Sequence, residues 1–378
     1  LSTITNEVIC MAGKKIIFSF FSGSGFLDLG FETNGFYIDL VNEFSPEFMR
    51  AYQYSRAKMS LRKPRFGFFN IDINEFLGDR KVELQQYLDT VHADGDLVGF
   101  IGGPPCPDFS IAGKNRGRNG DNGKLSKSYV DLIISMFENV KGLWKTARHR
   151  EFYEELKSAI VSVGYVVTDR LTNALEFGVP QDRDRILLFG IKSTLLSSPD
   201  NISNFPWDSF RNWNADEIKS LPWPVSDVFV ADSKTTCPDG LPEPFTVEYW
   251  FRKNDVEHHP NATDYFTPHN GLSRMEIVDE GDVSKKSYKR LHRWRYSPTV
   301  AYGNNEVHLH PYKLRRLSAA EALALQTLPK EFELPKDMTL TNKFKTIGNG
   351  VPYLLSSGIA KTIAEFLESD NLVGGASI

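Results

Sequence analysis

The chain has 378 residues, and its 44 Lys and Arg against 48 Asp and Glu give a formal net charge of −4. A hydrophobic share of 41% is enough for a sizeable core, which excludes a disordered chain. No apolar run approaches the roughly 18 residues of a membrane span, and the length predicts two domains or one domain with an insertion. Net charge alone argues against a nucleic-acid partner.

Cysteine and histidine are too sparse to build a disulfide scaffold or a metal site. The three cysteines, Cys10, Cys106 and Cys237, are far apart and odd in number. This spacing favours a reducing compartment, so we expect a cytoplasmic protein. His258–His259 and His308–His310 have no Cys or acidic partner at ligand spacing, and we therefore expect no metal.

The first half of the chain alternates short apolar runs with helical patterns. This alternation is typical of βαβ units, and it predicts an α/β fold with a doubly wound, mostly parallel sheet. Such sheets bind their ligands at the carboxyl ends of the strands. The main strand-like runs are Lys15–Phe21, Tyr37–Asn42, Phe66–Ile73, Leu97–Ile101, Met136–Val140, Tyr165–Leu171 and Arg185–Ile191.

From residue 193 to about 313 the chain is rich in Trp, Pro, Asn and Asp and has no sustained periodicity. We expect a second, smaller lobe here, irregular or β-rich. Helical patterns return at Ser318–Gln326, which opens on a capping-box signature, and at Tyr353–Leu367. The predicted organisation is a discontinuous α/β domain, 13–192 and 342–378, interrupted by a lobe at 193–341.

One junction is too short for the elements that it joins. The helical stretch Lys127–Ile134 runs directly into the strand-like run Met136–Val140. Connections typically need about two to six residues, so we expect several residues to be absent here. A start at Leu1 with Met11 inside the chain likewise suggests a trimmed N-terminus.

Three strand ends carry residues suited to an adenosine-containing cofactor. The first run ends in the small-residue loop Ser22–Gly25, where the backbone can approach a ligand closely. Glu43 ends the second run and could accept two ribose hydroxyls, and Asp72 with Ile73 could receive an adenine amino group. No Lys-Ser or Lys-Thr follows the loop, which disfavours a phosphate-binding P-loop.

A cysteine between prolines follows the run Leu97–Ile101. Cys106 lies in Gly102-Gly103-Pro104-Pro105-Cys106-Pro107, whose prolines and glycines specify a backbone path. We interpret it as a thiolate nucleophile, with a buried small hydrophobe as the alternative. The basic, glycine-rich stretch Ala112–Gly120 predicts a mobile loop over the site.

Charged residues mark two further strands. Glu138 interrupts an apolar run, where burial would raise its pKa toward that of a proton donor. The alternative is a solvated strand end. Arg183 and Arg185 alternate with aspartates, so both guanidinium groups are expected on one face, with a surface charge ladder as the alternative.

One basic segment lies in the irregular lobe. Lys285–Arg295 holds six basic residues and no acidic ones, interleaved with Tyr288, His292 and Trp294. This mixture favours contacts with phosphates and bases, although a solvated charge run is the alternative. A mildly acidic chain with such local basic segments predicts strongly salt-dependent binding of nucleic acid, which reverses the inference from net charge.

The order of these segments resembles the DNA (cytosine-5) methyltransferase family over about residues 14–192 and 313–367. The chain departs from the family pattern at Phe26, where a glycine is common, and at Pro107-Asp108, where a glutamine is common. The matching segments are FSGSGFLDLGFE, NE, DI, GGPPCPDFSIAGKNRG, FENVKGL, VPQDRDRILLFG, RRLSAAEALALQTLP and IGNGVPY.

The resemblance implies a Rossmann-like S-adenosylmethionine-dependent methyltransferase fold with a target-recognition lobe. It makes Cys106 the nucleophile, brings Glu138 to cytosine N3 and Arg185 to the O2 region, and has Arg183 support Arg185. The matching cofactor-pocket positions are Phe21, Gly23, Gly25, Glu43, Asp72, Ile73, Pro105 and Asn349. The expected DNA contacts are Lys114, Arg116, Arg118, Lys289, Arg290, Arg293 and Arg295.

We therefore expect a sequence-specific DNA (cytosine-5) methyltransferase that flips its target cytosine out of duplex DNA. It would use S-adenosylmethionine and no metal, act as a monomer away from membranes, and be paired functionally, not physically, with a restriction endonuclease. One alternative is a tRNA cytosine-5 methyltransferase of the same fold, whose distinguishing Cys-Phe-Thr segment is absent. Another is an inactive DNA-binding regulator, which the intact Cys106, Glu138 and Arg185 argue against.

Overall fold

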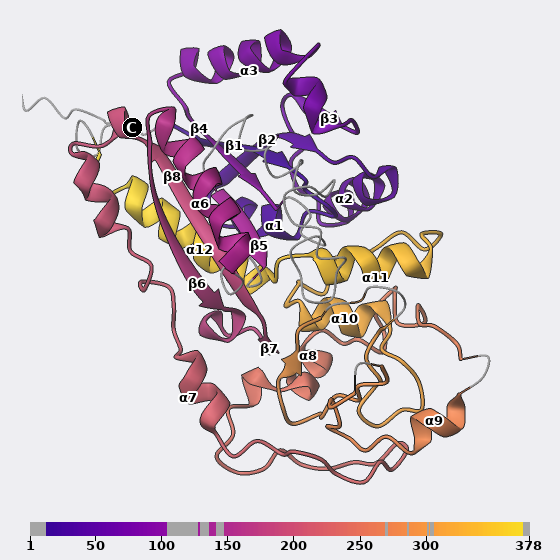
Figure 1. The fold of residues 1–378 in the computed structure, drawn as a ribbon. Helices are drawn as coiled ribbons and strands as arrows, with labels where there is room; N and C mark the ends of the chain where they lie inside the picture. Colours follow the sequence, from indigo (N-terminus) through magenta and orange to yellow (C-terminus); the bar gives the residue numbers. More distant parts are fainter. Residues whose placement is uncertain are drawn as a thin grey trace, which may run out of the picture.

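The computed structural model describes residues 13–103, 128, 136–140, 147–268, 271–285, 287–300, 302 and 306–372, with the backbone alone at 136–140 and 147–149. A seven-stranded sheet dominates this part of the chain (Figure 1). Its strands are β1 Lys15–Phe20, β2 Phe36–Asn42, β3 Gly67–Phe69, β4 Leu97–Gly102, β5 Met136–Val140, β6 Tyr165–Asn173 and β8 Asp184–Lys192. The helices are α1 Phe26–Glu32, α2 Pro46–Lys58, α3 Lys81–Ala93, α6 Ala147–Ser162, α7 Ala215–Ser220, α8 Val247–Lys253, α9 Leu272–Glu276, α10 Ala319–Leu325, α11 Leu340–Asn349 and α12 Tyr353–Leu367.

The sheet is mostly parallel, as the sequence predicts. Its order is β3-β2-β1-β4-β5-β8-β6, and neighbouring strands from β3 to β5 pair in parallel. Strand β8 is antiparallel to both β5 and β6. The α/β fold class is therefore confirmed, and so are most of the predicted strands, with small changes at their ends. The run Phe66–Ile73 is the exception, because only Gly67–Phe69 of it is a strand.

Helices cover both faces of the sheet, which makes it doubly wound (Figure 1). On one face α1 and α12 bury Phe31, Leu355 and Ile359 against the sheet. On the other face, side chains of α3 and α6, among them Leu84 and Leu156, pack against the strands. Both faces of the central strands are apolar, because a sheet covered by helices on each side has no solvated face.

Two of the C-terminal helices, α10 and α12, form where the sequence predicts them, whereas α11 was not predicted. Helix α10 begins with the expected capping box: Glu321 N–H donates to Ser318 Oγ at 3.2 Å, and Ser318 N–H donates to Glu321 Oε2 at 2.8 Å. Helix α12 has the predicted bounds, Tyr353–Leu367. The junction between Ile134 and Met136 lies outside the described residues, so the expected gap there stays a prediction.

The second lobe is irregular in its described residues, which is the first of the two alternatives predicted for it. Among its described residues the one named strand is β9, Ser297–Pro298, which pairs with β7, Gln181–Asp182. Side chains supply hydrogen bonds to main-chain groups that neighbouring strands would supply in a sheet. Asn261 Nδ2, for example, donates to the carbonyl of Leu334 at 2.9 Å. Buried carbonyls need a donor, and here side chains supply it without a sheet.

The packing does not break at residue 192. Phe205 stacks on Phe189 of β8 with ring centroids 4.3 Å apart, and Trp207 contacts Phe205 in turn. Residues that follow β8 therefore still belong to the core of the sheet. The two-part division remains our proposal, with a first boundary that this packing places after Trp207.

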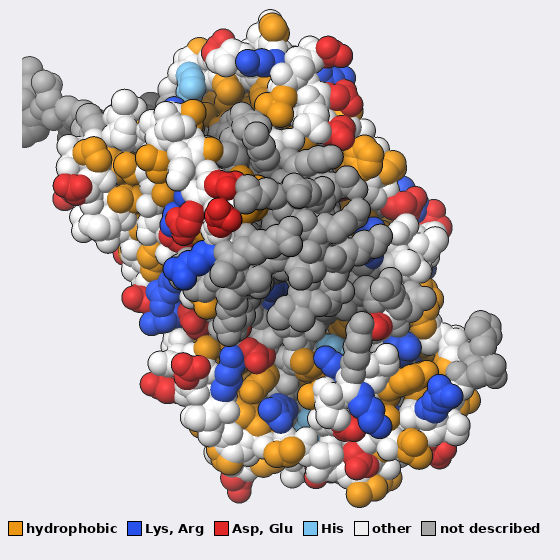
Figure 2. All heavy atoms as spheres, in the orientation of Figure 1, with side chains coloured by type: hydrophobic (Ala, Val, Ile, Leu, Met, Phe, Trp, Pro, Cys, Tyr) orange, Lys and Arg blue, Asp and Glu red, His pale blue; other side chains and the backbone are white. Residues whose placement is uncertain are grey.

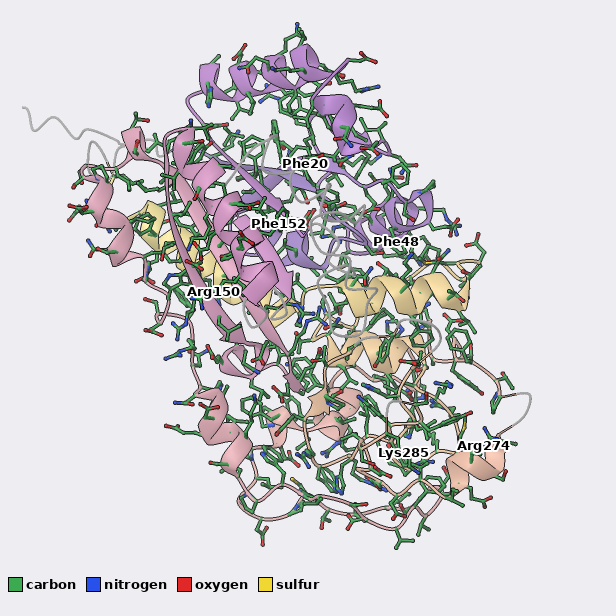
Figure 3. The ribbon with its side chains drawn as sticks, viewed as in Figure 1. Phe20, Phe48, Arg150, Phe152, Arg274 and Lys285 are labelled. Atoms are coloured by element: carbon green, nitrogen blue, oxygen red, sulfur yellow. The ribbon has the colours of Figure 1, made fainter. Side chains whose placement is uncertain are left out.

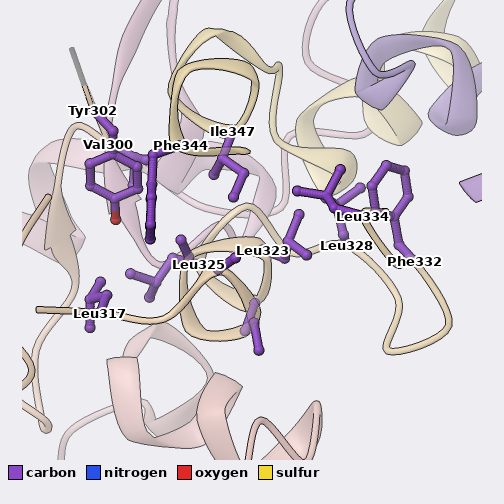
Figure 4. Close-up of a cluster of buried hydrophobic side chains, with 14 of the residues drawn as sticks. Val300, Tyr302, Leu317, Leu323, Leu325, Leu328, Phe332, Leu334, Phe344 and Ile347 are labelled. Atoms are coloured by element: carbon purple, nitrogen blue, oxygen red, sulfur yellow. The ribbon is translucent and has the colours of Figure 1, made fainter. Parts of the chain in front are cut away.

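A second core joins the lobe to the sheet's helices. It contains Phe26 of α1 and Phe48 of α2 together with Trp250 of α8. Figure 4 shows its centre, where Leu323 and Leu325 of α10 lie opposite Phe344 and Ile347 of α11. In the described part of the chain, no helix is both long and apolar enough to cross a membrane.

Candidate active site

Two strands, β1 and β4, end side by side next to β5 at the edge where the sequence places the site. Phe20 of β1 pairs with Gly102 of β4, and Gly102 pairs with Phe137 of β5. The cofactor loop follows β1, the segment with Cys106 follows β4, and Glu138 belongs to β5. Five predicted site residues lie outside the described residues: Pro105, Cys106, Lys114, Arg116 and Arg118.

The loop after β1 needs its glycines. Phe21, Gly23 and Gly25 have φ values of 52°, 56° and 82°, a region that disfavours residues with a Cβ. A Cβ on Gly25 would lie 2.5 Å from the Tyr52 ring, whereas one on Gly23 would meet no described atom closer than Thr346 Oγ1 at 4.0 Å. The loop is thus packed on its inner side and open at Gly23.

Glu43 reaches this loop from the end of β2. Its Oε2 accepts the Gly23 N–H at 2.9 Å and its Oε1 accepts the Ser45 N–H at 2.7 Å. Burial raises the pKa of Glu43, while the main-chain donors of Ser45 and Gly23 oppose that rise. A carboxylate has about four acceptor sites, so the two that remain fit a ribose diol.

Asp72 lies at the end of the neighbouring strand. Its Oδ1 accepts the Asn74 N–H at 2.9 Å and so caps the 3-10 helix Ile73–Phe76, with Ile73 buried in the core. Asn70 Nδ2 donates to the carbonyl of Glu43 at 2.7 Å, which ties the two acidic strand ends together. The structure thus brings Glu43 and Asp72 to one edge of the sheet, and an adenosine site there stays a prediction.

The end of α11 closes the same region. Asn349 is exposed there, and the preceding Thr346 shares a 2.7 Å hydrogen bond with the Ser24 hydroxyl. A Cβ on Gly350 would clash with the ring of Phe26, so this turn lies tightly against the start of α1. The Ser24–Thr346 contact was missed by the sequence reasoning, because no motif links these two hydroxyls.

The register of β5 and β8 brings two predicted catalytic positions together. Glu138 pairs with Leu187 and Val140 pairs with Arg185. Alternate residues of a strand share a face, so positions 138 and 185 are diagonal neighbours on one face, typically about 7–8 Å apart at their Cα atoms. Arg185 is 9% exposed, and its Nη1 donates to the Asp184 carbonyl at 2.8 Å.

Arg183 is buried among main-chain carbonyls. Its guanidinium donates to Gly350 O at 3.0 Å and to Val300 O at 3.2 Å, and 1% of the residue is exposed. Gln181 and Gln326, to which the sequence analysis gives no role, complete this group: Gln181 Oε1 accepts the Val300 N–H at 3.0 Å. Gln326 Nε2 donates to Ile347 O at 2.5 Å. Arg183 therefore connects the start of β8 to Val300 of the lobe and to Gly350 at the end of α11.

Two of the expected DNA contacts, Arg290 and Arg293, are buried in the structure. The Arg290 guanidinium donates to the carbonyls of Val278, Met275 and His310 at 2.6–2.8 Å and is fully buried. Arg293 is 3% exposed and forms an ion pair with Glu280 at 2.6 Å. The segment passes through the core of the lobe, so these two arginines hold the lobe together instead of facing solvent.

The other described basic residues of the segment are not fully buried. Lys289 and Arg295 are half-buried, and Lys285 is exposed in the lower lobe, where Arg274 also lies (Figure 3). Figure 2 shows Lys and Arg side chains spread over this lobe. DNA contact by Lys289 and Arg295 stays a prediction.

Burial disfavours the charged form of two histidines of the lobe, His308 and His310. Burial lowers the pKa of His308 to about 3 and also lowers that of His310. Among the described residues no three His, Cys, Asp or Glu side chains gather as a metal site. The expectation of a metal-free protein stays a prediction.

Comparison with known proteins gives one consistent family. The family described as C-5 cytosine-specific DNA methylase matches residues 16–365. Type II methyltransferase M.NmeDI of Neisseria meningitidis serogroup C is 53% identical over 363 residues, covering 94% of this chain and 85% of that protein. Type II methyltransferase M.FnuDI of Fusobacterium nucleatum is 28% identical, covering 93% of this chain and 94% of its own.

Solved structures share the fold. A protein described as a DNA modification methyltransferase of an E. coli prophage gives a TM-score of 0.61 at 21% identity, covering 94% of this chain and 99% of its own. A DNMT2 of Spodoptera frugiperda gives 0.56 at 15% identity, covering 93% of this chain and 100% of its own. The sheet is thus that of the S-adenosylmethionine-dependent methyltransferase fold.

Proposed function

The chain belongs to the C-5 cytosine-specific DNA methylase family, and from that premise we propose that it methylates carbon 5 of one cytosine in a defined duplex sequence, with Cys106 as the nucleophile. It is a DNA (cytosine-5) methyltransferase of the type II restriction-modification kind. The finer assignments below, residue by residue, are our proposal.

Cofactor binding is assigned to the edge formed by β1, β2 and β3. Glu43 would accept the ribose hydroxyls, Asp72 the adenine amino group, and the open loop at Gly23 would lie along the ligand, with Phe21, Gly25, Ile73, Pro105 and Asn349 completing the pocket. S-adenosylmethionine, the methyl donor of this family, supplies an electrophilic sulfonium methyl group when it is bound.

Cys106 makes carbon 5 reactive. Cytosine C5 is a poor nucleophile, and addition of the thiolate to C6 pushes an electron pair toward C5, so that one hard step becomes two easier ones. After C5 has taken the methyl group, a base removes the C5 proton, the C5–C6 double bond re-forms and the thiolate leaves. The cysteine is thereby regenerated.

Glu138 and Arg185 stabilise the charge that this addition moves onto the ring. Glu138 would protonate or hydrogen-bond N3, and Arg185 would contact the O2 region. Arg183, buried among the carbonyls of Val300 and Gly350, would support Arg185 by fixing the start of β8.

None of these atoms of the base is accessible in a stacked duplex. We therefore assign a flipped-out target cytosine, at a cost of a few kcal/mol for unstacking. The loop that carries Lys114, Arg116 and Arg118 would close over the base, and the lobe around Lys289 and Arg295 would read the sequence. The enzyme would act as a monomer and share its recognition sequence with a restriction endonuclease without binding it.

One observation carries the proposal. The pairings Phe20–Gly102, Gly102–Phe137 and Val140–Arg185 bring the strand ends that bear the cofactor loop, the Cys106 segment, Glu138 and Arg185 to one edge. These segments are far apart in the sequence, and a shared edge is what a single reaction between cofactor and base requires.

Transfer of tritium from labelled S-adenosylmethionine tests the proposal. We expect incorporation into duplex DNA of diverse sequence, none into tRNA, and none into either substrate with Cys106→Ala. Incorporation into tRNA alone would identify the RNA-modifying alternative. Sequence-specific DNA binding without any transfer would identify the inactive regulator.

A further inference from the structure

A buried arginine outside every recognised motif contacts the cofactor loop. Arg56 belongs to α2, one turn after Tyr52, and is 4% exposed. Its Nη1 donates to the carbonyl of Ser24 at 3.2 Å and its Nη2 to the carbonyl of Gly25 at 2.5 Å. Both carbonyls belong to the loop after β1, so a helix more than twenty residues away holds the loop from behind.

The two carbonyls are structurally important ones. Gly25 O also accepts the Leu29 N–H at 3.1 Å, which is the first hydrogen bond of α1, so Arg56 acts where loop becomes helix. On the other side of the loop the Ser24 hydroxyl is tied to Thr346 of α11. The path of the loop is thus fixed from α2 and from α11 at once.

The charge of Arg56 is balanced by the half-buried carboxylate of Glu32. Glu32 Oε2 accepts from Nη2 at 2.9 Å, and the guanidinium carbon lies 4.1 Å from the centre of the Tyr52 ring. Tyr52 in turn donates to Asp28 at 2.9 Å, and Ser19 donates to the other oxygen of Asp28 at 2.8 Å. The cluster Arg56, Glu32, Tyr52, Asp28 and Ser19 connects α2, α1 and β1.

Burying an ion cluster is a costly way to obtain stability alone. Well-packed apolar side chains are often as stabilising as a buried ion pair, whereas a guanidinium offers five donors in a rigid fork and so fixes the direction of its partners. Here that fork is directed at two loop carbonyls. Geometry of the loop is the feature that an apolar replacement could not reproduce.

We propose that Arg56 is a positioning residue for S-adenosylmethionine: by holding the Ser24 and Gly25 carbonyls, it keeps the loop in the path that the cofactor requires. This inference rests on the proposed cofactor site. Arg56 does not contact the reacting atoms, so its loss weakens cofactor binding in the ground state and the transition state alike. Such a loss raises KM for the cofactor and leaves kcat unchanged.

Three variants of the full chain separate positioning from stability. Arg56→Lys keeps the charge and loses the fork, while Glu32→Gln disturbs the ion cluster and keeps both carbonyl contacts. Arg50→Lys is the matched control, because Arg50 lies on the same helix and forms exposed ion pairs with Glu47 and Asp337. Each is measured for the KM of S-adenosylmethionine, kcat, the Kd of S-adenosylhomocysteine and the melting temperature.

We expect Arg56→Lys to raise both KM and Kd by about tenfold, the size of one lost charged hydrogen bond, with kcat within about twofold. Glu32→Gln should lower the melting temperature about as much as Arg56→Lys does and leave KM and Kd unchanged. Arg50→Lys should leave KM, Kd and the melting temperature unchanged. A lower melting temperature with unchanged KM and Kd in Arg56→Lys would overturn the inference.

The Kd measurement also separates this inference from the proposed function. Weaker S-adenosylhomocysteine binding by Arg56→Lys, in a chain whose wild type transfers no methyl group to DNA, would support Arg56 and overturn the DNA methylation assignment. If the wild type transfers methyl groups to DNA and Arg56→Lys binds S-adenosylhomocysteine with an unchanged Kd, the DNA methylation assignment is supported and the role of Arg56 is overturned.

Discussion

Arginines in the two halves of the molecule show how differently a motif and a composition predict a role. In the sheet domain, the family motif implies the role of Arg185, and the structure brings this residue beside position 138 at the edge of the sheet. In the lobe, Arg290 and Arg293 were predicted from a charge run, and both are buried in internal contacts. A strand end specifies where a side chain can act, whereas a charge run does not say which of its members faces solvent.

The contrast has a physical origin. A parallel sheet converts the order of its strands into a fixed neighbourhood at one edge, so residues distant in sequence meet there predictably. The lobe has no such rule, because its described residues form few ladders and its carbonyls are satisfied by individual side chains such as those of Arg290 and Asn261. The arrangement of the lobe depends on individual side-chain contacts, which sequence periodicity does not predict.

The largest expected effect on stability would come from breaking the Arg293–Glu280 ion pair inside the lobe. Arg293→Met leaves the buried carboxylate of Glu280 without its partner and should lower the free energy of unfolding by about 3–5 kcal/mol. Arg295→Met, in the same segment but half-buried, should cost less than about 1 kcal/mol and weaken DNA binding instead. Urea denaturation measures both changes, and equal losses of stability would contradict the distinction between the two arginines.

The sheet domain offers a pH test of its buried cluster. Burial raises the pKa of Asp28 from 3.8 to about 6, so the folded protein holds this proton more tightly than the unfolded chain. The contribution of Asp28 to the free energy of unfolding should therefore be greatest below about pH 4. It should fall by roughly 2–3 kcal/mol as the pH rises to about 6.

Asp28→Asn should remove that fall and be the more stable protein at pH 7, because Asn keeps a similar shape without a charge. Denaturation midpoints at several pH values between about 4 and 7.5 isolate Asp28 as the difference between the two proteins. Parallel curves for wild type and variant would contradict a raised pKa.

The smallest effect should come from the basic segment that remains near solvent. Lys289→Ala should weaken binding to all duplex sequences alike and reduce the slope of log K against log salt by about one. Lys361→Ala, an exposed lysine of α12 on the sheet domain, serves as the control. An unchanged slope for Lys289→Ala would remove this residue from the DNA surface.

Sequence reasoning reached most of the fold and part of the site. It predicted the strands, α12 and the Ser318 capping box, because periodicity and capping are local properties. It could not predict the Arg56 contacts with the cofactor loop or the Thr346–Ser24 hydrogen bond, since each depends on helices that meet only in the folded chain. It also mistook buried arginines for surface ones, because a guanidinium satisfied by carbonyls reads the same in sequence as one in solvent.

The central claim is that Cys106 forms a bond with C6 of a cytosine in duplex DNA during methyl transfer. Duplex DNA of diverse sequence with 5-fluorocytosine in place of cytosine tests it directly, because the fluorine on C5 cannot leave as a proton does and the adduct is trapped. We predict a protein–DNA complex that survives denaturing electrophoresis, requires S-adenosylmethionine and is absent with Cys106→Ala. A complex that persists in Cys106→Ala, or no complex with the wild-type protein, would contradict the account.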